Sequence, residues 1–204
     1  MTRTSKSLKQ RLNSGEFIIA PGIYDMIGAV VCNKVGFDFV YASGYWSTAS
    51  AYGLPDAGIS TFTQMLDRYS ILCRTVNAGV IADADTGYGG LLNVHHTVKD
   101  FEAAGICAIQ IEDQEFPKRC GHTPGKRVVE TSAMVDKIKV ACAPEKTQMR
   151  PSLLHEPMRG RQTDLRMRWI VASPLKRRAR MLSLSKPCIR KTKCARPASL
   201  SISP

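Results

Sequence analysis

Residues 81–90 read Ile-Ala-Asp-Ala-Asp-Thr-Gly-Tyr-Gly-Gly. A short β-branched run that ends in two acids predicts a buried strand with Asp83 and Asp85 at its carboxyl end. Side chains alternate along a strand, so both carboxylates are expected on the same side. Such a pair repels unless a proton or a cation lies between its members, and Mg²⁺ prefers hard oxygen ligands of this kind. On this stretch alone, a solvated turn rich in Asp and Gly remains the alternative.

A second apolar run that ends in acids lies at residues 108–114. They read Ala-Ile-Gln-Ile-Glu-Asp-Gln, with Glu112 and Asp113 near the end. The segment between the two runs, roughly residues 93–104, has the apolar spacing of a helix. Strand, helix and strand predict a parallel βαβ unit. Parallel α/β folds carry their chemistry at the carboxyl ends of strands, so the acids mark a candidate site.

The first 142 residues predict four consecutive strand–helix units. The expected strands are 16–20, 37–42, 79–82 and 108–114. The expected helices are 8–12, 25–36, 61–77, 93–104 and 131–141. The second, capped by Asp25 and ended by Gly36, is expected to turn Ile27, Val30 and Val31 toward the core. The third is expected to bury Met65, Tyr69 and Leu72 on one face. Four such units in about 140 residues indicate half of an eight-stranded β/α barrel, or a small open sheet.

Two further segments lie where chemistry is expected. Residues 43–46, Ser-Gly-Tyr-Trp, follow the second strand, and a Ser-Gly turn there can hold a carboxylate or phosphate through its hydroxyl and N–H groups. A plain connector is the alternative. Residues 54–60 form a predicted loop that contains Asp56.

Cys120 is predicted to be the reactive cysteine. It lies in a polar loop beside Lys118, Arg119 and His122, and neighbouring cations lower the pKa of a thiol. Structural cysteines lie in apolar runs, as Cys73 and Cys107 do, and Cys120 does not. A surface loop with an unreactive cysteine and a solvated His122 is the alternative.

The charge of the chain is unevenly distributed. Of 29 Lys and Arg and 17 Asp and Glu residues, 14 of each kind lie in residues 1–142, so the net charge of +12 lies in residues 143–204. That tail is rich in Pro, Arg and Ser, and its composition predicts disorder or loose collapse. Seven scattered cysteines without zinc spacing, no membrane-length apolar run and no signal-like core predict a cytoplasmic protein.

Six motifs in residues 7–141 resemble one enzyme family. They are Ala-Pro-Gly-Ile-Tyr-Asp (20–25), Tyr-Ala-Ser-Gly-Tyr (41–45), Gly-Leu-Pro-Asp (53–56), Ala-Asp-Ala-Asp-Thr-Gly-Tyr-Gly (82–89), Ile-Glu-Asp-Gln (111–114) and Pro-Lys-Arg-Cys-Gly-His (117–122). Together they resemble the isocitrate lyase / phosphoenolpyruvate mutase superfamily, with most similarity to short-chain members of the methylisocitrate lyase and dimethylmalate lyase type.

The resemblance implies a (β/α)₈ TIM barrel, usually assembled as a homotetramer, of which this chain carries the N-terminal half. It implies Mg²⁺, with Mn²⁺ as the alternative ion, and a small di- or tricarboxylic or oxo-acid substrate at the carboxyl face. The implied metal residues are Asp83 and Asp85, with Asp56 and Glu112 behind them. The implied substrate-binding residues are Tyr41, Ser43, Gly44 and Gly121. The implied catalytic residues are Cys120, Lys118 and His122.

Within the superfamily, the cysteine is typical of lyases that cleave carbon–carbon bonds, which implies retro-aldol cleavage with the Cys120 thiol as proton donor. The alternatives are a phosphonate enzyme of the carboxyvinyl-carboxyphosphonate or phosphonopyruvate type, and an oxaloacetate decarboxylase. An alternative of another class is non-specific nucleic-acid binding through the basic tail.

The family continues beyond Cys142 with a strand that ends in an Arg-Thr-Asp motif, and no such strand is predicted in this sequence. The hypothesis is that residues from about 143 onward come from a shifted reading frame. The domains predicted are therefore a half barrel, 1–142, and an irregular basic tail, 143–204, and the half barrel is expected to have little activity alone.

Overall fold

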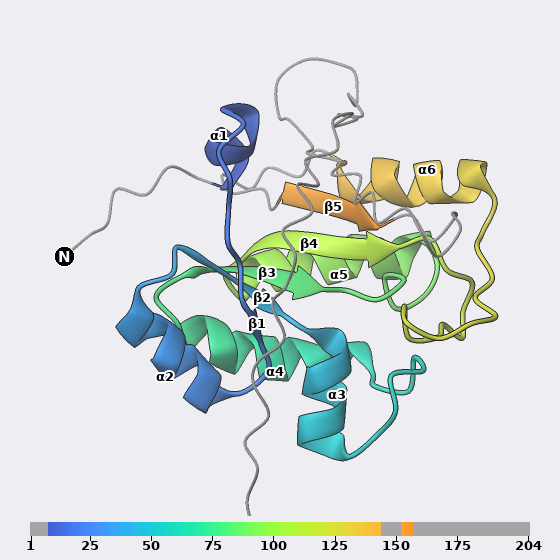
Figure 1. The fold of residues 1–204 in the computed structure, drawn as a ribbon. Helices are drawn as coiled ribbons and strands as arrows, with labels where there is room; N and C mark the ends of the chain where they lie inside the picture. Colours follow the sequence, from blue (N-terminus) through green and yellow to red (C-terminus); the bar gives the residue numbers. More distant parts are fainter. Residues whose placement is uncertain (1–7, 144–151, 157–204) are drawn as a thin grey trace, which may run out of the picture.

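The computed structural model describes residues 8–143 and 152–156, which form a parallel five-stranded sheet with helices packed around it (Figure 1). The strands are β1 (Gly22–Ile23), β2 (Phe39–Ala42), β3 (Gly79–Asp83), β4 (Ile106–Glu112) and β5 (Ser152–Glu156). The helices are α1 (Leu8–Asn13), α2 (Met26–Val35), α3 (Gly44–Tyr52), α4 (Phe62–Thr75), α5 (Leu91–Ala103) and α6 (Thr131–Ala141).

The strands follow one another across the sheet in chain order from β1 to β5, and every neighbouring pair is parallel. A doubly wound open sheet reverses its strand order at a switch point, whereas the wall of a β/α barrel keeps the order of the chain. The predicted parallel α/β fold is confirmed, and the described strands form the N-terminal part of a barrel-type wall.

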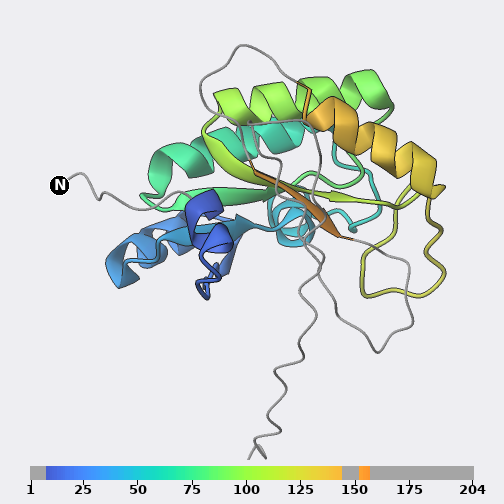
Figure 2. The same cartoon turned by 90° about the horizontal axis from the view of Figure 1, so that it is seen from above.

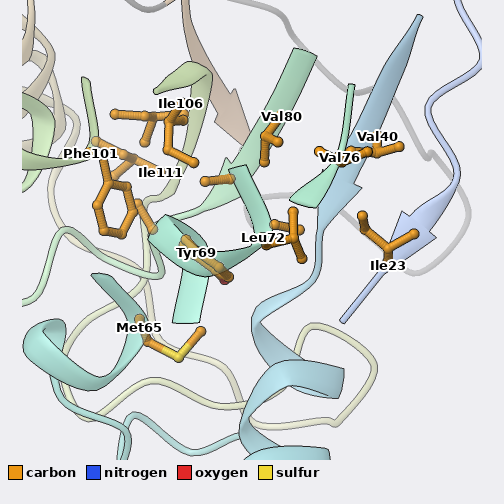
Figure 3. Close-up of a cluster of buried hydrophobic side chains, with 14 of the residues drawn as sticks. Ile23, Val40, Met65, Tyr69, Leu72, Val76, Val80, Phe101, Ile106 and Ile111 are labelled. Carbon is orange, nitrogen blue, oxygen red and sulfur yellow. The ribbon is translucent and has the colours of Figure 1, made fainter. Parts of the chain in front are cut away.

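Helices α2, α4, α5 and α6 cover one face of the sheet, each in contact with the next (Figures 1 and 2). The main core lies between these helices and the strands (Figure 3). Helix α4 contributes Met65, Tyr69 and Leu72, which are almost fully buried, as its spacing predicts. The ring of Phe101 from α5 meets that of Tyr69 edge-on, with centroids 5.6 Å apart, a favourable arrangement of two aromatic rings.

Helix α1 covers part of the other face of the sheet (Figure 2). Its Leu8 packs against Phe39, Ile81 and Ala108, which come from β2, β3 and β4. Arg11 fixes the helix by donating to Asp38 at 2.9 Å. Three neighbouring strands therefore present apolar side chains on the inner face, and α1 shields them from water.

Local signals fix the ends of the helices. Asp25 caps α2 by accepting a hydrogen bond of 2.6 Å from the Gly28 amide, as predicted. Gly36 ends α2 with φ 85°, a left-handed conformation that glycine adopts without strain. Thr61 and Gln64 form a reciprocal capping box at the start of α4.

The strand predicted at residues 16–20 is wrong. These residues are not in a strand, and Phe17 and Ile19 are 87% and 60% exposed. Strand β1 begins at Gly22, where its pairing with β2 begins. An apolar run becomes a strand only where a neighbouring strand is in register with it, and the sequence pattern does not give that position.

The predicted inner face of α2 is also wrong. Ile27, Val30 and Val31 are 77%, 46% and 52% exposed, whereas Ala29 and Cys32 are buried. Helix α2 packs against α4 through small side chains, which let the two helices approach closely. The periodicity of apolar residues takes no account of side-chain size. It therefore predicted burial of the face with bulky side chains, instead of the face whose small side chains fit against α4.

The segment at residues 43–46 is the start of a helix and not the predicted turn. Ser43 is the N-cap of α3, and its hydroxyl accepts from the Trp46 amide at 3.4 Å. Serine is among the preferred N-cap residues. The segment Gly44–Tyr52 contains few strongly apolar residues, so the helix has no periodic stripe by which to predict it.

Within the stretch expected to be an irregular tail, the segment Ser152–Glu156 forms β5 and pairs in parallel with β4. The rest of the 143–204 tail beyond Ala143, with the shifted-frame hypothesis and the nucleic-acid alternative, lies outside the described residues. Within the described ranges, no helix has the length and apolar character needed to cross a membrane.

We predict that Leu72→Ala lowers the free energy of unfolding by about 2–5 kcal/mol, because it leaves a cavity at a fully buried position. The matched control is Ile27→Ala on the exposed face of α2, which should change stability by less than about 0.5 kcal/mol. Urea unfolding followed by circular dichroism measures both. Equal losses in the two variants would contradict the observed packing of α2 and α4.

Candidate active site

Acidic side chains gather at the carboxyl edge of the sheet. Asp83 and Glu112 are the last residues of β3 and β4, and both are buried. Asp85 follows two residues after Asp83, and Asp56 comes from the loop between α3 and α4. Because parallel strands end at the same edge, the fold brings together carboxylates that lie up to 56 residues apart in the sequence.

The ammonium of Lys118 lies among these carboxylates. It forms ion pairs with Asp56 and, at 2.5 Å, with Asp85, and its side chain is only 1% exposed. Burial opposes the charge of Lys118, but the carboxylates of Asp85, Asp83 and Glu112 outweigh burial and raise the pKa of the lysine. Lys118 is therefore held as a cation.

The turn after β3 holds the two aspartates in place. The amide of Asp85 donates to Asp83 Oδ1 at 2.9 Å, and the amide of Gly44 donates to Asp83 Oδ2 at 3.2 Å. Asp85 has φ 47°, so it belongs to the turn, and strand alternation does not orient its side chain. A Cβ on Gly44 would lie 2.7 Å from Asp83 Oδ2, so only glycine permits this approach.

The pKa of Asp85 is raised by its surroundings. Burial and the nearby charge of Asp83 raise the pKa of Asp85 to about 6, although Lys118 acts in the opposite direction. Two carboxylates that share one site favour either a proton or a cation between them.

The loop after β4 folds back onto the acidic cluster. Gln114 donates to Glu112 Oε2 at 2.7 Å and to the Arg119 carbonyl at 2.8 Å, and its own side-chain oxygen accepts from the Arg119 amide at 3.1 Å. The sequence analysis assigned Gln114 no role, although the residue closes the Ile-Glu-Asp-Gln motif. It ties the loop that carries Lys118 and Cys120 to the end of β4.

Cys120 is half-buried, and its sulfur lies 3.8 Å from His122 Nδ1. The two other expected neighbours have different partners: the ammonium of Lys118 is bound to Asp56 and Asp85, and the guanidinium of Arg119 donates to the Pro124 carbonyl at 3.3 Å. The geometry therefore pairs the thiol with an imidazole, whose ring nitrogen can accept or donate a hydrogen bond.

Three of the four residues expected to bind substrate lie on β2 or at the start of α3. Tyr41 is on β2, and Ser43 and Gly44 begin α3 at the carboxyl end of that strand. The Gly44 amide bonds to Asp83 in this structure, so a carboxylate would have to meet the other N–H groups at the start of α3. The Gly121 carbonyl accepts from Lys126, which fixes the backbone next to Cys120.

A cavity of about 350 Å³ opens beside the acidic cluster. Asp85 and Lys118 contribute to its wall, together with the aromatic rings of Phe62, Tyr88 and Phe116. The cavity gives a small organic molecule room next to charged side chains.

The chemistry of these donors fits Mg²⁺, because all four carboxylates supply hard oxygen atoms. Their arrangement is not yet that of a metal site: among the described residues, no three His, Cys, Asp or Glu side chains are placed to hold an ion together. The lysine ammonium instead lies between Asp56 and Asp85.

The fold and the site define a protein of the β/α-barrel class with an acidic centre at the carboxyl edge of its sheet. Residues 8–153 match the family described as phosphoenolpyruvate phosphomutase. This match covers more than half of the chain, which therefore belongs to the phosphoenolpyruvate phosphomutase/isocitrate lyase superfamily, as its motifs predict.

Curated relatives include 2,3-dimethylmalate lyase of Eubacterium barkeri, 43% identical over 138 residues, which are 68% of this chain and 48% of the relative. The 2-methylisocitrate lyase of Halalkalibacterium halodurans is 44% identical over 131 residues, 64% of this chain and 43% of the relative. The chain thus spans about half the length of these relatives.

Solved structures give the same result. A crystal structure of 2,3-dimethylmalate lyase is 36% identical with a TM-score of 0.69, over 74% of this chain and 50% of the other. Phosphonopyruvate hydrolase in complex with oxalate and Mg²⁺ is 30% identical with a TM-score of 0.64, over 74% and 50% of the two chains.

We predict that a thiol reagent at pH 8 modifies Cys120 before Cys73 and Cys107. Burial raises the pKa of Cys73 to about 11 and that of Cys107 to about 12, so their reactive thiolates are scarce. Peptide mapping by mass spectrometry after short exposures gives the order of modification. Earlier labelling of Cys73 or Cys107 would contradict the assignment of Cys120 as the accessible thiol.

We also predict that the metal-free chain loses stability between pH 4 and pH 7. The pKa of Asp85 is raised from 3.8 to about 6, so the folded state binds this proton more tightly than the unfolded state. Its contribution is complete below pH 4 and is lost as the pH rises through 6, by up to about 3 kcal/mol. Urea unfolding of wild type and Asp85→Asn across this range measures the effect. A pH slope that is as steep in Asp85→Asn as in wild type would contradict this role of Asp85.

Proposed function

We propose that this chain carries half of the active site of a Mg²⁺-dependent carbon–carbon lyase. The substrate is a 2-hydroxy acid of the methylisocitrate, isocitrate or dimethylmalate type, and the products are pyruvate or glyoxylate and a second acid. The observation that carries the proposal is the meeting of Asp56, Asp83, Asp85 and Glu112 with Lys118 at one edge of the sheet. The similarity to 2,3-dimethylmalate and 2-methylisocitrate lyases supports it.

Asp83 and Asp85 would hold the cation, with Asp56 and Glu112 behind them. A bound Mg²⁺ would stabilise the negative charge that develops on the oxygen atoms of an oxo acid during cleavage. The amide bond from Gly44 to Asp83 and the bond from Gln114 to Glu112 orient two of these carboxylates, so their hydrogen bonds prepare the ligands for an ion.

Cys120 and His122 would carry out the proton transfer that the cleavage requires. In retro-aldol cleavage the carbon bearing the hydroxyl becomes a carbonyl carbon, the hydroxyl proton passes to water, and the electron pair of the broken carbon–carbon bond leaves with the other fragment. That fragment needs a proton, and the thiol of Cys120 supplies it. His122 Nδ1, 3.8 Å from the sulfur, is close enough to return a proton to the thiol after a small adjustment.

The proposal also covers substrate binding, assembly and compartment. Tyr41, Ser43, Gly44 and Gly121 would bind the carboxylate end of a small oxo or di- or tricarboxylic acid. A homotetramer is the proposed assembly of the complete enzyme. Cys32, Cys73, Cys107, Cys120 and Cys142 are free thiols, which suits the reducing cytoplasm that we propose as its compartment.

The test is an assay of the purified 204-residue chain with Mg²⁺ on 2-methylisocitrate, 2,3-dimethylmalate, isocitrate, oxaloacetate and phosphonopyruvate. We predict little turnover by the chain alone and release of pyruvate or glyoxylate from one of the hydroxy acids once a family-like second half of the barrel is added. In that form Cys120→Ser should lower kcat by about 10²–10⁴-fold, because the proton donor is removed. The matched control is Cys142→Ser at the end of α6, which should retain activity.

The outcomes separate the alternatives. Turnover of phosphonopyruvate without cleavage of the hydroxy acids would favour a phosphonate enzyme. Turnover of oxaloacetate alone would favour an oxaloacetate decarboxylase. If the chain is inactive alone but activity appears when a family-like second half of the barrel is added, the site is intact and the wall is incomplete. Inactivity in both forms would contradict the proposal.

A further inference from the structure

The turn after β3 has an unusual backbone. Among the described residues, the only residues other than glycine with a left-handed φ are Asp85, at 47°, and Tyr88, at 58°. This conformation is costly for a residue with a side chain, and a residue with a bulky ring adopts it rarely. It persists only where the surrounding structure holds the backbone in place. The turn therefore depends on contacts from other elements.

Three consecutive carbonyl groups of this turn, those of residues 85–87, each accept a hydrogen bond from a different element. The donors are the Glu112 amide of β4 to Asp85 at 2.7 Å, the Lys137 ammonium of α6 to Thr86 at 2.9 Å, and the Thr97 hydroxyl of α5 to Gly87 at 3.3 Å. Helices α5 and α6 lie side by side (Figures 1 and 2). The turn is thus fixed by one strand and two helices that follow it in the chain.

Lys137 is the charged donor of the three, and hydrogen bonds from a charged group are stronger than those from a neutral one. Its side chain is half-buried, and burial lowers the pKa of Lys137, whereas the carboxylate of Asp113 acts in the opposite direction. Lys139, two residues further along α6, has a 70% exposed side chain and pairs with Asp136 in the same helix. Lys137 instead reaches across to a turn 51 residues earlier in the sequence.

The turn sets the direction of the Asp85 carboxylate. Asp85 lies beyond the end of β3, so its side chain is directed by the left-handed backbone and not by strand alternation. In this conformation the carboxylate pairs with Lys118 at 2.5 Å. If the Thr86 carbonyl were free to rotate, the preceding residue could leave the left-handed region, and its carboxylate would point elsewhere.

We propose that Lys137 is a positioning residue of the acidic site: its ammonium holds the turn after β3 through the Thr86 carbonyl and thereby fixes the direction of the Asp85 carboxylate. The inference rests on the proposed function, because Asp85 is one of the carboxylates on which the cleavage depends. It deepens that proposal by assigning a role at the site to a residue of α6.

The first experiment measures hydrogen exchange by mass spectrometry on the full chain, in a peptide that contains residues 84–88. Within this turn the Gly87 amide donates to the Ala84 carbonyl at 2.8 Å. In Lys137→Met, which removes the donor but keeps most of the side chain's length, this peptide should exchange about tenfold faster than in wild type. A peptide from the centre of β4 should exchange as in wild type. The matched control, Lys139→Met, should leave both peptides unchanged.

The second experiment measures kcat and KM per folded molecule in the form completed by a family-like second half of the barrel. Lys137→Met should lower kcat by about 10–100-fold with a smaller change in KM, because a misdirected Asp85 no longer supports the reaction. Lys137→Arg, which restores a charged donor, should recover both kcat and the slow exchange of the turn. Lys139→Met should have wild-type constants. A residue that served stability alone would change the folded fraction and not the kcat of folded molecules.

If Lys137→Met does not fold, Lys137→Gln takes its place in both measurements. It keeps an uncharged N–H donor on a side chain one bond shorter, and it should show the same changes at smaller size.

Unchanged exchange of the 84–88 peptide in Lys137→Met would overturn the inference and leave the proposed lyase site intact. Equally faster exchange in the β4 peptide would also overturn it, because the loss would then be global. Faster exchange confined to the turn, together with a wild-type kcat, would overturn the positioning role. Faster exchange confined to the turn, in a chain that cleaves no substrate even when completed, would support the hold of Lys137 on the turn and count against the proposed function.

Discussion

Repulsion among carboxylates is the constraint on which this structure depends. Parallel strands end at one edge of the sheet, and the fold therefore gathers Asp83, Asp85 and Glu112 in a site with little access to water. A gathering of this kind is stable only with a compensating cation or proton. Lys118 supplies one by bridging Asp85 to Asp56, and its loop is held over the edge of the sheet as a result. The position of Cys120 follows from that arrangement.

Much of the fold could be predicted because its signals are local. The apolar face of α4, the Asp25 cap, the Gly36 stop and the β3–α5–β4 unit each depend on residues close together in the sequence. Chain-order pairing of parallel strands then follows from the repeated strand–helix pattern. The acids at the strand ends were predictable for the same reason, because the carboxyl edge of a parallel sheet is a known meeting point.

Other features depend on contacts that a sequence pattern does not record. The buried face of α2 is set by how closely Ala29 and Cys32 can approach α4, and bulky Ile27 stays outside. The ammonium of Lys118 was expected near the thiol of Cys120 as a sequence neighbour, yet three-dimensional charge pairing draws it into the acidic cluster. Gln114 acquires its role only when the loop folds back. In each case a long-range contact outweighs the local pattern.

The central claim is the proposal that the acidic edge of the sheet is the cation site of a carbon–carbon lyase. The most direct measurement is crystallography of the chain with Mn²⁺, using the anomalous scattering of manganese to locate the ion. The claim predicts one strong peak within about 2.5 Å of carboxylate oxygens of Asp83 or Asp85. A map without a peak at this edge at saturating Mn²⁺ would contradict it.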